Sequence, residues 1–350
     1  SAFLLNRSSD LDLILNKTKN YFRCIGTVNE MNLKRENTEI MLKDEKGADK
    51  EKATCERIYG TFTVRTDSGI LTFNTYFTSL TQLPNKDGKH ESKQWAMAEK
   101  MMEWNPEING NGDAATLVNV EGRLDVNDYV GNDGEVKTGT RFTVSKASTK
   151  VNPDDVKGCS WSGVMFIKGM RPETRGTDNE ETGRLIVDLY GANSKGECLP
   201  FKAIVEEELA EDFEEAYSAG ETVPMDIDVI SRHVGEDTKT VKKKAFGRGG
   251  SVSVNSGFDV TEMIIVGADE ALEEPEEEDE DGNIIPNGYI DPDTMKVAIK
   301  ERAKRLEELK SNGGATASPK KESIKEAKKK MGNSKKHIEA DPFDDEDDPF

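Results

Sequence analysis

The chain has 350 residues, enough for two domains with additional tails; 34% of its residues are hydrophobic and 33% are charged. This much charge predicts that part of the chain does not pack into a core. The formal net charge of −20 excludes a generally basic protein, so any surface that binds nucleic acid has to be a local patch.

The cysteines and histidines show no metal-binding pattern. Cys24, Cys55, Cys159 and Cys198 include no C-x-x-C pair, and only three histidines are present. A zinc site needs clustered ligands, so we expect free thiols, no metal and no cofactor. The first residues lack the basic region and apolar run of a signal peptide, and no apolar run is long enough to span a membrane. These features predict a soluble cytoplasmic protein.

The first part of the chain predicts an N-terminal arm followed by a β-rich domain. Residues 1–53 hold a short apolar run and one strand, at 21–28, which we interpret as an arm and an extra strand. A β-hairpin follows at 55–76, because β-branched and aromatic residues alternate with polar ones around a turn at 67–69. Residues 92–104 have helical spacing, and 117–127 and 138–146 alternate as strands.

A second copy of this plan begins at residue 159. The run at 161–168 matches 58–65, and the two runs lie 103 positions apart. A hairpin is predicted at 159–190, a strand at 199–205, an amphipathic helix at 205–217, and strands at 223–229 and 258–266. The order hairpin, strand, helix, strand, strand is that of the five-stranded OB barrel, whose helix follows the third strand.

We therefore predict a mainly β protein with two tandem OB-fold barrels, each with one helix. The first barrel spans 54–150 and the second spans 155–268. An immunoglobulin-like sandwich is the alternative, but it offers no fixed place for a helix in both copies.

The composition changes after residue 268. Residues 269–290 form an acidic linker, in which 269–281 contain ten acids and no base. A helix is predicted at 291–312, because Asp291-Pro292 combines a capping residue with proline in the first turn. Residues 313–350 are rich in serine, lysine and acids, a composition that predicts a disordered tail.

No catalytic constellation is visible in the sequence. The phosphate-binding loop G-x-x-x-x-G-K-[ST] and the metalloprotease pattern H-E-x-x-H are both absent. Gly247-Arg248-Gly249-Gly250 lacks the third glycine of a dinucleotide loop. The sequence therefore predicts no catalytic residues, no small-molecule substrate and no enzyme activity.

The predicted barrels carry a repeated outward pattern of one aromatic and one basic residue. If Phe62, Val64, Leu71 and Phe73 point inward, strand alternation turns Tyr59, Arg65 and Tyr76 outward. The same alternation exposes four residues of the second copy: Phe166, Lys168, Arg184 and Tyr190. Single-stranded nucleic acid is bound by this combination, because bases stack on aromatic faces and cations follow the phosphates. Further candidates for the rim are Arg123, Arg141, Arg171, Arg175, Lys242, Lys243, Lys244, Phe246 and Arg248.

The final segment of the chain has the most specific pattern. Residues 341–350 contain six acids and no base, and the acidic run 344–348 is followed by Pro349-Phe350. This segment resembles the acidic tail of bacterial and phage single-stranded DNA-binding proteins. The resemblance implies that replication, recombination and repair proteins dock on Asp344, Asp345, Glu346, Asp347, Asp348, Pro349 and Phe350. The bacterial family has one barrel per chain, so two barrels indicate a phage-encoded relative acting in the host cytoplasm.

These features together predict a sequence-tolerant single-stranded DNA-binding protein. We expect it to coat and protect single strands in replication or recombination and to recruit partner proteins through its tail. The alternative is an acidic adaptor that binds only other proteins, because residues 1–268 also carry a net negative charge. The sequence leaves open the oligomeric state, DNA against RNA, the site size and the partners.

Overall fold

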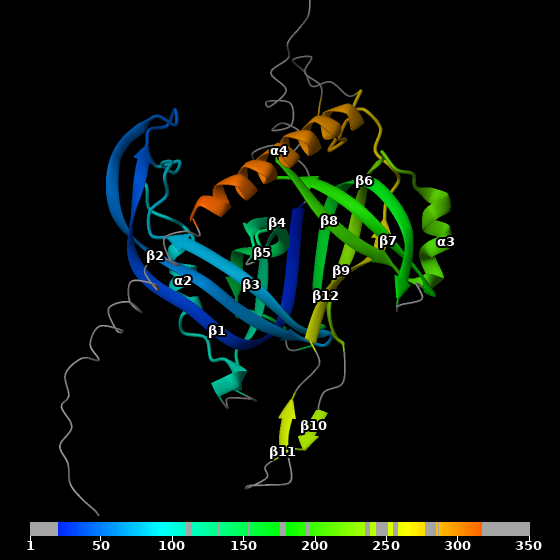
Figure 1. Ribbon diagram of the computed structural model, residues 1–350. Helices are drawn as coiled ribbons and strands as arrows, with labels where there is room; N and C mark the ends of the chain where they lie inside the picture. Colours follow the sequence, from blue (N-terminus) through cyan, green and yellow to red (C-terminus); the bar gives the residue numbers. More distant parts are fainter. Residues whose placement is uncertain are drawn as a thin grey trace, which may run out of the picture. The chain divides into compact units, whose positions relative to one another are not determined.

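The protein is mainly β, and its principal sheet has ten strands with both antiparallel and parallel pairings (Figure 1). The computed structural model describes residues 20–109, 114–131, 133–152, 154–175, 180–193, 197–234, 239–242, 251–254, 258–276, 285 and 287–316. Within these ranges the sheet is accompanied by three α-helices, α2, α3 and α4. None of the described helices combines the length and apolar character that a membrane-spanning helix needs.

Five strands form a first closed cycle. They are β1 (Asn20–Lys43), β2 (Asp49–Thr66), β3 (Gly69–Thr78), β4 (Leu117–Val130) and β5 (Val136–Ser148). They pair in the order β1-β2-β3-β5-β4, and β4 pairs again with β1. The helix α2 (Trp95–Met101) and the 3-10 turn η1 (Glu107–Asn109) lie between the third and fourth strands of this cycle.

A second cycle repeats this topology. Its strands are β6 (Cys159–Arg175), β7 (Glu180–Ala192), β8 (Cys198–Val205), β9 (Thr222–Val234) and β12 (Phe258–Ala268). They pair in the order β6-β7-β8-β12-β9, and β9 returns to β6. The helix α3 (Glu207–Ala216) follows the third strand and lies beside β7 and β8 (Figure 1). A two-stranded ribbon, β10 (Lys239–Lys242) with β11 (Ser251–Val254), is part of the connection from β9 to β12.

Aromatic side chains fill the first cycle. Phe62, Val64, Leu71 and Phe73 are fully buried, which confirms the inward direction predicted from alternation. Phe73 packs on both Phe62 and Phe142, with ring centroids 5.6 and 5.7 Å apart. Gly60 supports the sharp coiling of β2 against β1, because it has a φ of +134° and a Cβ there would lie 2.2 Å from a backbone oxygen of β1.

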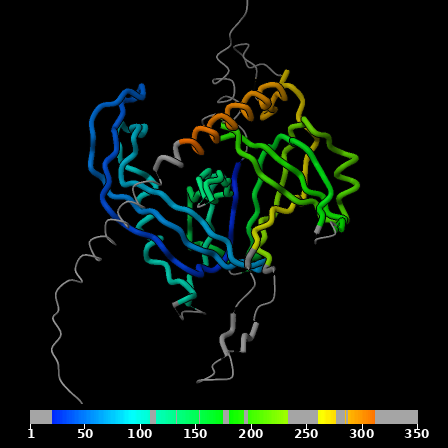
Figure 2. Tube along the Cα trace, in the orientation of Figure 1, coloured from blue at the N-terminus to red at the C-terminus, as the bar shows by residue number. Residues whose placement is uncertain are grey.

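The start of β1 joins the two cycles. It runs beside β6 (Figure 2) and pairs antiparallel with it. In this pairing Cys24 lies directly opposite Cys159. The Trp161 indole donates a hydrogen bond of 3.0 Å to the Asn20 side-chain oxygen across this seam. Cys24, Cys55, Cys159 and Cys198 are all free thiols, and all four are buried.

The strand order differs from the sequence interpretation at one point. The strand predicted at 21–28 as an extra strand of the N-terminal arm is the beginning of β1, the first strand of the first cycle. The first cycle therefore begins at Asn20 instead of residue 54. As a consequence, the matched hairpins are offset by one strand: β2 is second in its cycle, whereas β6 is first. Alternating hydrophobicity reveals a hairpin, but it does not show which place each strand takes in the cycle.

The C-terminal helix predicted at 291–312 is confirmed as α4 (Pro292–Thr316). The chain divides into two compact units, one of residues 1–127 and 139–300 and the other of 128–138 and 301–350. The first unit contains the first turns of α4. In the second unit the remainder of α4 contacts the β4–β5 hairpin, where Arg302 forms a buried ion pair of 2.6 Å with Asp128.

Candidate nucleic-acid interface

The outward face of β1, β2 and β3 carries an aromatic pair. Tyr59 of β2 lies directly opposite Tyr76 of β3, and Lys34 of β1 lies opposite Tyr59. Residues Ile58 and Phe77 beside them point into the core, so alternation turns both tyrosines outward. Tyr76 is 57% exposed, and Tyr59 is half-buried. This face therefore presents two adjacent aromatic rings to solvent, as predicted for these two residues.

Arg57 completes this patch. Its guanidinium lies 4.6 Å from the ring centre of Tyr59 and 6.0 Å from that of Tyr76. It also binds Glu36 on β1, and the Tyr59 hydroxyl donates a 3.0 Å hydrogen bond to the same carboxylate. The hydrogen bonds from Arg57 and then from Tyr59 lower the pKa of Glu36. We call Arg57, Tyr59 and Tyr76 the tyrosine patch.

The sequence prediction missed Arg57. The signal was available, because Arg57 is two positions before Tyr59 on the same strand and shares its outward direction. An arginine that lies over a cross-strand pair of aromatic rings combines a cation with stacking faces, and single-stranded nucleic acid is bound by this combination in general.

Most of the other predicted cations of the first cycle are engaged with side chains of the protein. Arg65 lies on the outward face of β2 and forms an ion pair of 2.7 Å with Glu107. Arg123 pairs with Asp125 at 3.0 Å, and Arg141 donates to the Asn127 side chain at 3.1 Å. All three are exposed, but the structure does not gather them into one basic groove. Arg65 and Arg123 are therefore each paired with one carboxylate, and Arg141 with a neutral amide.

Alternate residues of β3, from Tyr76 back to Ile70, face outward and form a row. This row leads from the tyrosine patch to a hollow of about 450 Å³. Ile70 and Thr72 of β3 form one wall, and Ser231 and Thr261 of the second cycle form another. The lining is completed by Thr140, Phe142 and Met263. Ile70 lies six positions before Tyr76, which corresponds to roughly 20 Å along a strand. Between them the outward row carries Thr72 and Asn74.

The second predicted aromatic pair is covered. Phe166 on β6 lies directly opposite Tyr190 on β7, and Lys168 lies 5.6 Å from the Tyr190 ring centre. Lys168 is exposed, but Phe166 and Tyr190 are only 7% and 9% exposed. Their predicted exposure is wrong. Both point away from the interior of the cycle, but they pack in a separate apolar cluster with Ile290, Met295 and Ala298.

Arg184 is also buried, contrary to the prediction of an outward cation. Its side chain is 7% exposed and lies within 3.0 to 3.3 Å of Glu173, Glu206 and Glu262. These carboxylates come from β6, the start of α3 and β12. Arg184 therefore ties three elements of the second cycle together. Arg171 is exposed and binds Asp188 on β7.

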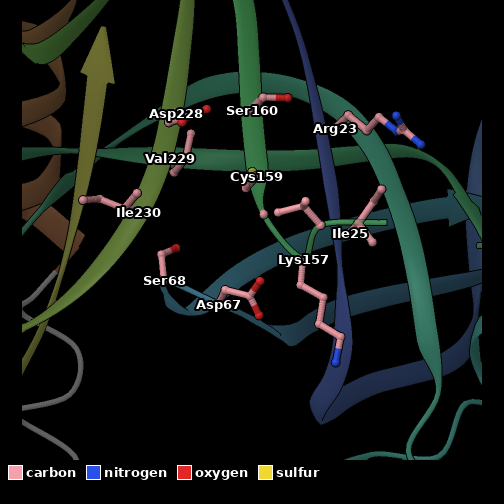
Figure 3. A pocket seen from close by; sticks show the side chains of 12 residues that line it. Arg23, Ile25, Asp67, Ser68, Lys157, Cys159, Ser160, Asp228, Val229 and Ile230 are labelled. Carbon is pink, nitrogen blue, oxygen red and sulfur yellow. The ribbon is translucent and has the colours of Figure 1, made fainter. Parts of the chain in front are cut away.

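A pocket of about 340 Å³ lies where β1, the β2–β3 turn, β6 and β9 meet. Figure 3 shows that the side chains of Arg23 and Lys157 point away from Cys159 rather than toward a common centre. Asp67 and Asp228 contribute opposite charge to the lining. Because the cations do not converge and acids accompany them, this pocket does not form a phosphate-binding site.

The remaining predicted residues lie at or beyond the limits of the described structure. Arg175 is the last residue of β6 and Lys242 is the last residue of β10. Outside the described residues lie Lys243, Lys244, Phe246, Arg248, Asp344, Asp345, Glu346, Asp347, Asp348, Pro349 and Phe350.

The chain matches the model of a known protein family. A model of the YorF family matches residues 19–312, which is most of the chain and includes both cycles and most of α4. The chain belongs to the YorF family. No curated protein matches the sequence.

Among solved structures, this YorF-family chain is similar to the single-stranded DNA-binding protein from Thermus aquaticus. The wild-type protein is 11% identical with a TM-score of 0.37, and the match covers 76% of this chain and 99% of that one. A deletion mutant of the same protein is 14% identical with a TM-score of 0.36, covering 75% of this chain and 100% of the other.

Proposed function

We propose that this protein binds single-stranded DNA through the outward face of β1, β2 and β3. The tyrosine patch carries the proposal: two rings lie side by side on neighbouring strands, with an arginine over both. A base stacked on such rings is held without regard to its identity, so the binding is sequence-tolerant. The hollow at the end of the outward row of β3 extends the path along which the single-stranded DNA lies.

We infer that both cycles are OB barrels. Each closes in the order first, second, third, fifth, fourth strand, and each has its helix after the third strand. The five-stranded OB barrel binds oligonucleotides on the face of its second and third strands. Tyr59 and Tyr76 lie on those two strands of the first cycle, which agrees with the assignment of the site.

The cellular role that fits this activity is coating and protection of single strands in replication, recombination or repair. Partner proteins would dock on the acidic segment 344–350, as its resemblance to the tails of single-stranded DNA-binding proteins implies. An acidic adaptor that binds only proteins is the second candidate. It is supported by the net charge of −20 and by the ion pairs of Arg65 and Arg123.

The test is binding of a labelled oligo(dT), about 30 nucleotides long, measured by fluorescence anisotropy at low salt. Tyr76→Ala should weaken binding by about 1–3 kcal/mol, or roughly 5- to 150-fold, if a base stacks on this ring. Tyr129→Ala is the matched control, because Tyr129 is 48% exposed on β4 and is not part of the tyrosine patch. Failure of the intact chain to bind would favour the adaptor.

A further inference from the structure

The covered pair on the second cycle resembles the open tyrosine patch, because each combines two aromatic rings on neighbouring strands with one cation. Phe166 and Tyr190 are direct cross-strand neighbours, as Tyr59 and Tyr76 are. A cation lies near a ring in each case, Lys168 at 5.6 Å from Tyr190 and Arg57 at 4.6 Å from Tyr59. Both pairs point away from the interior of their cycle. The two pairs differ in their strands, because Tyr59 and Tyr76 lie on the second and third strands of their cycle and Phe166 and Tyr190 on the first and second. They also differ in exposure, because the pair on the second cycle is covered.

The cover is the short segment 290–299, which includes the first turns of α4. Ile290, Met295 and Ala298 are buried against Phe166, Tyr190 and Cys198, and Ile299 packs at the edge. Two hydrogen bonds with the Thr222 hydroxyl anchor this segment: the hydroxyl donates to the Ile290 carbonyl at 3.2 Å and accepts from the Ile290 amide at 3.1 Å. The cluster is separate from the large core that holds the cycles together.

The start of α4 contains its own helix cap. Asp291 caps the helix, accepting from the Thr294 amide at 2.8 Å and from the Thr294 hydroxyl at 2.7 Å. Asp291 and Thr294 both belong to the covering segment, so their cap persists if the segment leaves the sheet. Detachment therefore exposes the aromatic pair without leaving the helix N-terminus uncapped.

We propose that residues 290–299 form a displaceable cover over a second single-strand-binding surface, made of Phe166, Lys168 and Tyr190. The proposal rests on the function proposed above. A single strand that occupies the tyrosine patch competes with the cover for the second surface only when the strand is long enough to reach it. Short strands use the first surface alone, and long strands use both.

The first experiment measures backbone hydrogen exchange of residues 290–300 in the unmodified full chain, with saturating oligo(dT) of about 10 or 60 nucleotides. The long oligonucleotide should speed exchange at least two-fold, because it displaces the segment, and the short one should leave the rate unchanged. Unchanged or slower exchange with the long oligonucleotide overturns the proposal. This measurement needs no variant, so it stands even where a substitution disturbs folding.

The second experiment weakens the cover. Ile290→Ala combined with Met295→Ala should raise affinity for the long oligonucleotide at least three-fold and increase the number of nucleotides occluded per chain. Affinity for the short oligonucleotide should not change. Val297→Ala is the matched control, because Val297 lies on the same helix but is not part of the apolar cluster. Adding Tyr190→Ser to the double variant should remove the gain.

The outcomes separate the two proposals. If the intact chain binds oligo(dT) through Tyr76 but the double variant gains neither affinity nor site size, the second surface is refuted and the first stands. If neither protein binds oligo(dT), both proposals are overturned. If only the double variant binds, the covered surface is the binding site and the assignment to the tyrosine patch is wrong.

Discussion

Arg57 shows how much the function of one residue depends on its partner. Its guanidinium stacks on two tyrosines, but it also binds Glu36, so a phosphate has to compete with a carboxylate for the same donors. The contacts from Arg57 and Tyr59 lower the pKa of Glu36, so this competitor stays ionised at neutral pH and also at a pH where a glutamate begins to take up a proton. The acid of β1 therefore limits the contribution that Arg57 makes to binding.

Glu36→Gln should strengthen binding of single-stranded oligo(dT) by a few-fold, because Arg57 then becomes available to a phosphate. One additional phosphate contact should make the slope of log affinity against log salt steeper by about 0.7. Glu30→Gln is the control, since it removes the same charge from β1 without releasing Arg57. Equal gains from both substitutions would show that overall charge, rather than Arg57, is responsible.

At the scale of the element, strand alternation correctly predicted which side of a strand each of these side chains lies on. It did not predict what covers that side. It placed Phe62 and Phe73 inside and Tyr76 outside, and those positions are correct. Phe166 and Tyr190 also lie on the predicted side of their strands. They are buried because a segment about 100 to 130 residues further along the chain covers them. Periodicity within a strand contains no information about that segment.

The buried position of Arg184 has the same origin. Its three carboxylate partners are 11, 22 and 78 positions away in the sequence, so no local pattern reveals the cluster. A charged outward residue is normally exposed, and here the chain folds three acids around it. The cluster was therefore not predictable from the strand that carries Arg184.

Arg184→Ala should destabilise the protein by about 3–5 kcal/mol, because it leaves the carboxylates of Glu173 and Glu262 buried beside each other without their main cation. Urea unfolding measures this loss. Arg171→Ala is the matched control: Arg171 is exposed with its partner Asp188, so its removal should cost about 0–1 kcal/mol. A loss below about 1 kcal/mol for Arg184→Ala would contradict this expectation. It would mean that Arg232, whose guanidinium lies 3.5 Å from the Glu262 carboxylate, balances the charge without Arg184.

At the scale of the whole molecule, the repeated plan was predictable and its strand numbering was not. The turn residues and alternation of β2–β3 and β6–β7 are visible in the sequence, as is the helix after each third strand. The place of β1 was missed, because it pairs with β2, β4 and β6 through contacts between residues up to 143 positions apart. The tyrosine patch was found in part, through Tyr59 and Tyr76.

The net charge of the whole molecule leads to the last prediction. A protein of charge −20 repels phosphates at long range, and six of its acids lie within residues 341–350. Removing this segment changes the formal charge from −20 to −14. The repulsion extends about 30 Å at 0.01 M salt but only about 8 Å at 0.15 M. Removal should therefore raise affinity for oligo(dT) several-fold at 0.01 M salt and leave it nearly unchanged at 0.15 M.

Two variants separate charge from the other properties of the segment. Replacing its six acids with asparagine and glutamine keeps the length and should reproduce the gain, whereas Phe350→Ala keeps every acidic side chain and should leave affinity as it was. Anisotropy titrations across the salt range measure all three proteins against the intact chain. If removal has no effect at 0.01 M salt, the strand binds where the field of these acids does not reach. If the gain persists at 0.15 M, the segment occupies the binding surface directly instead of acting through long-range repulsion.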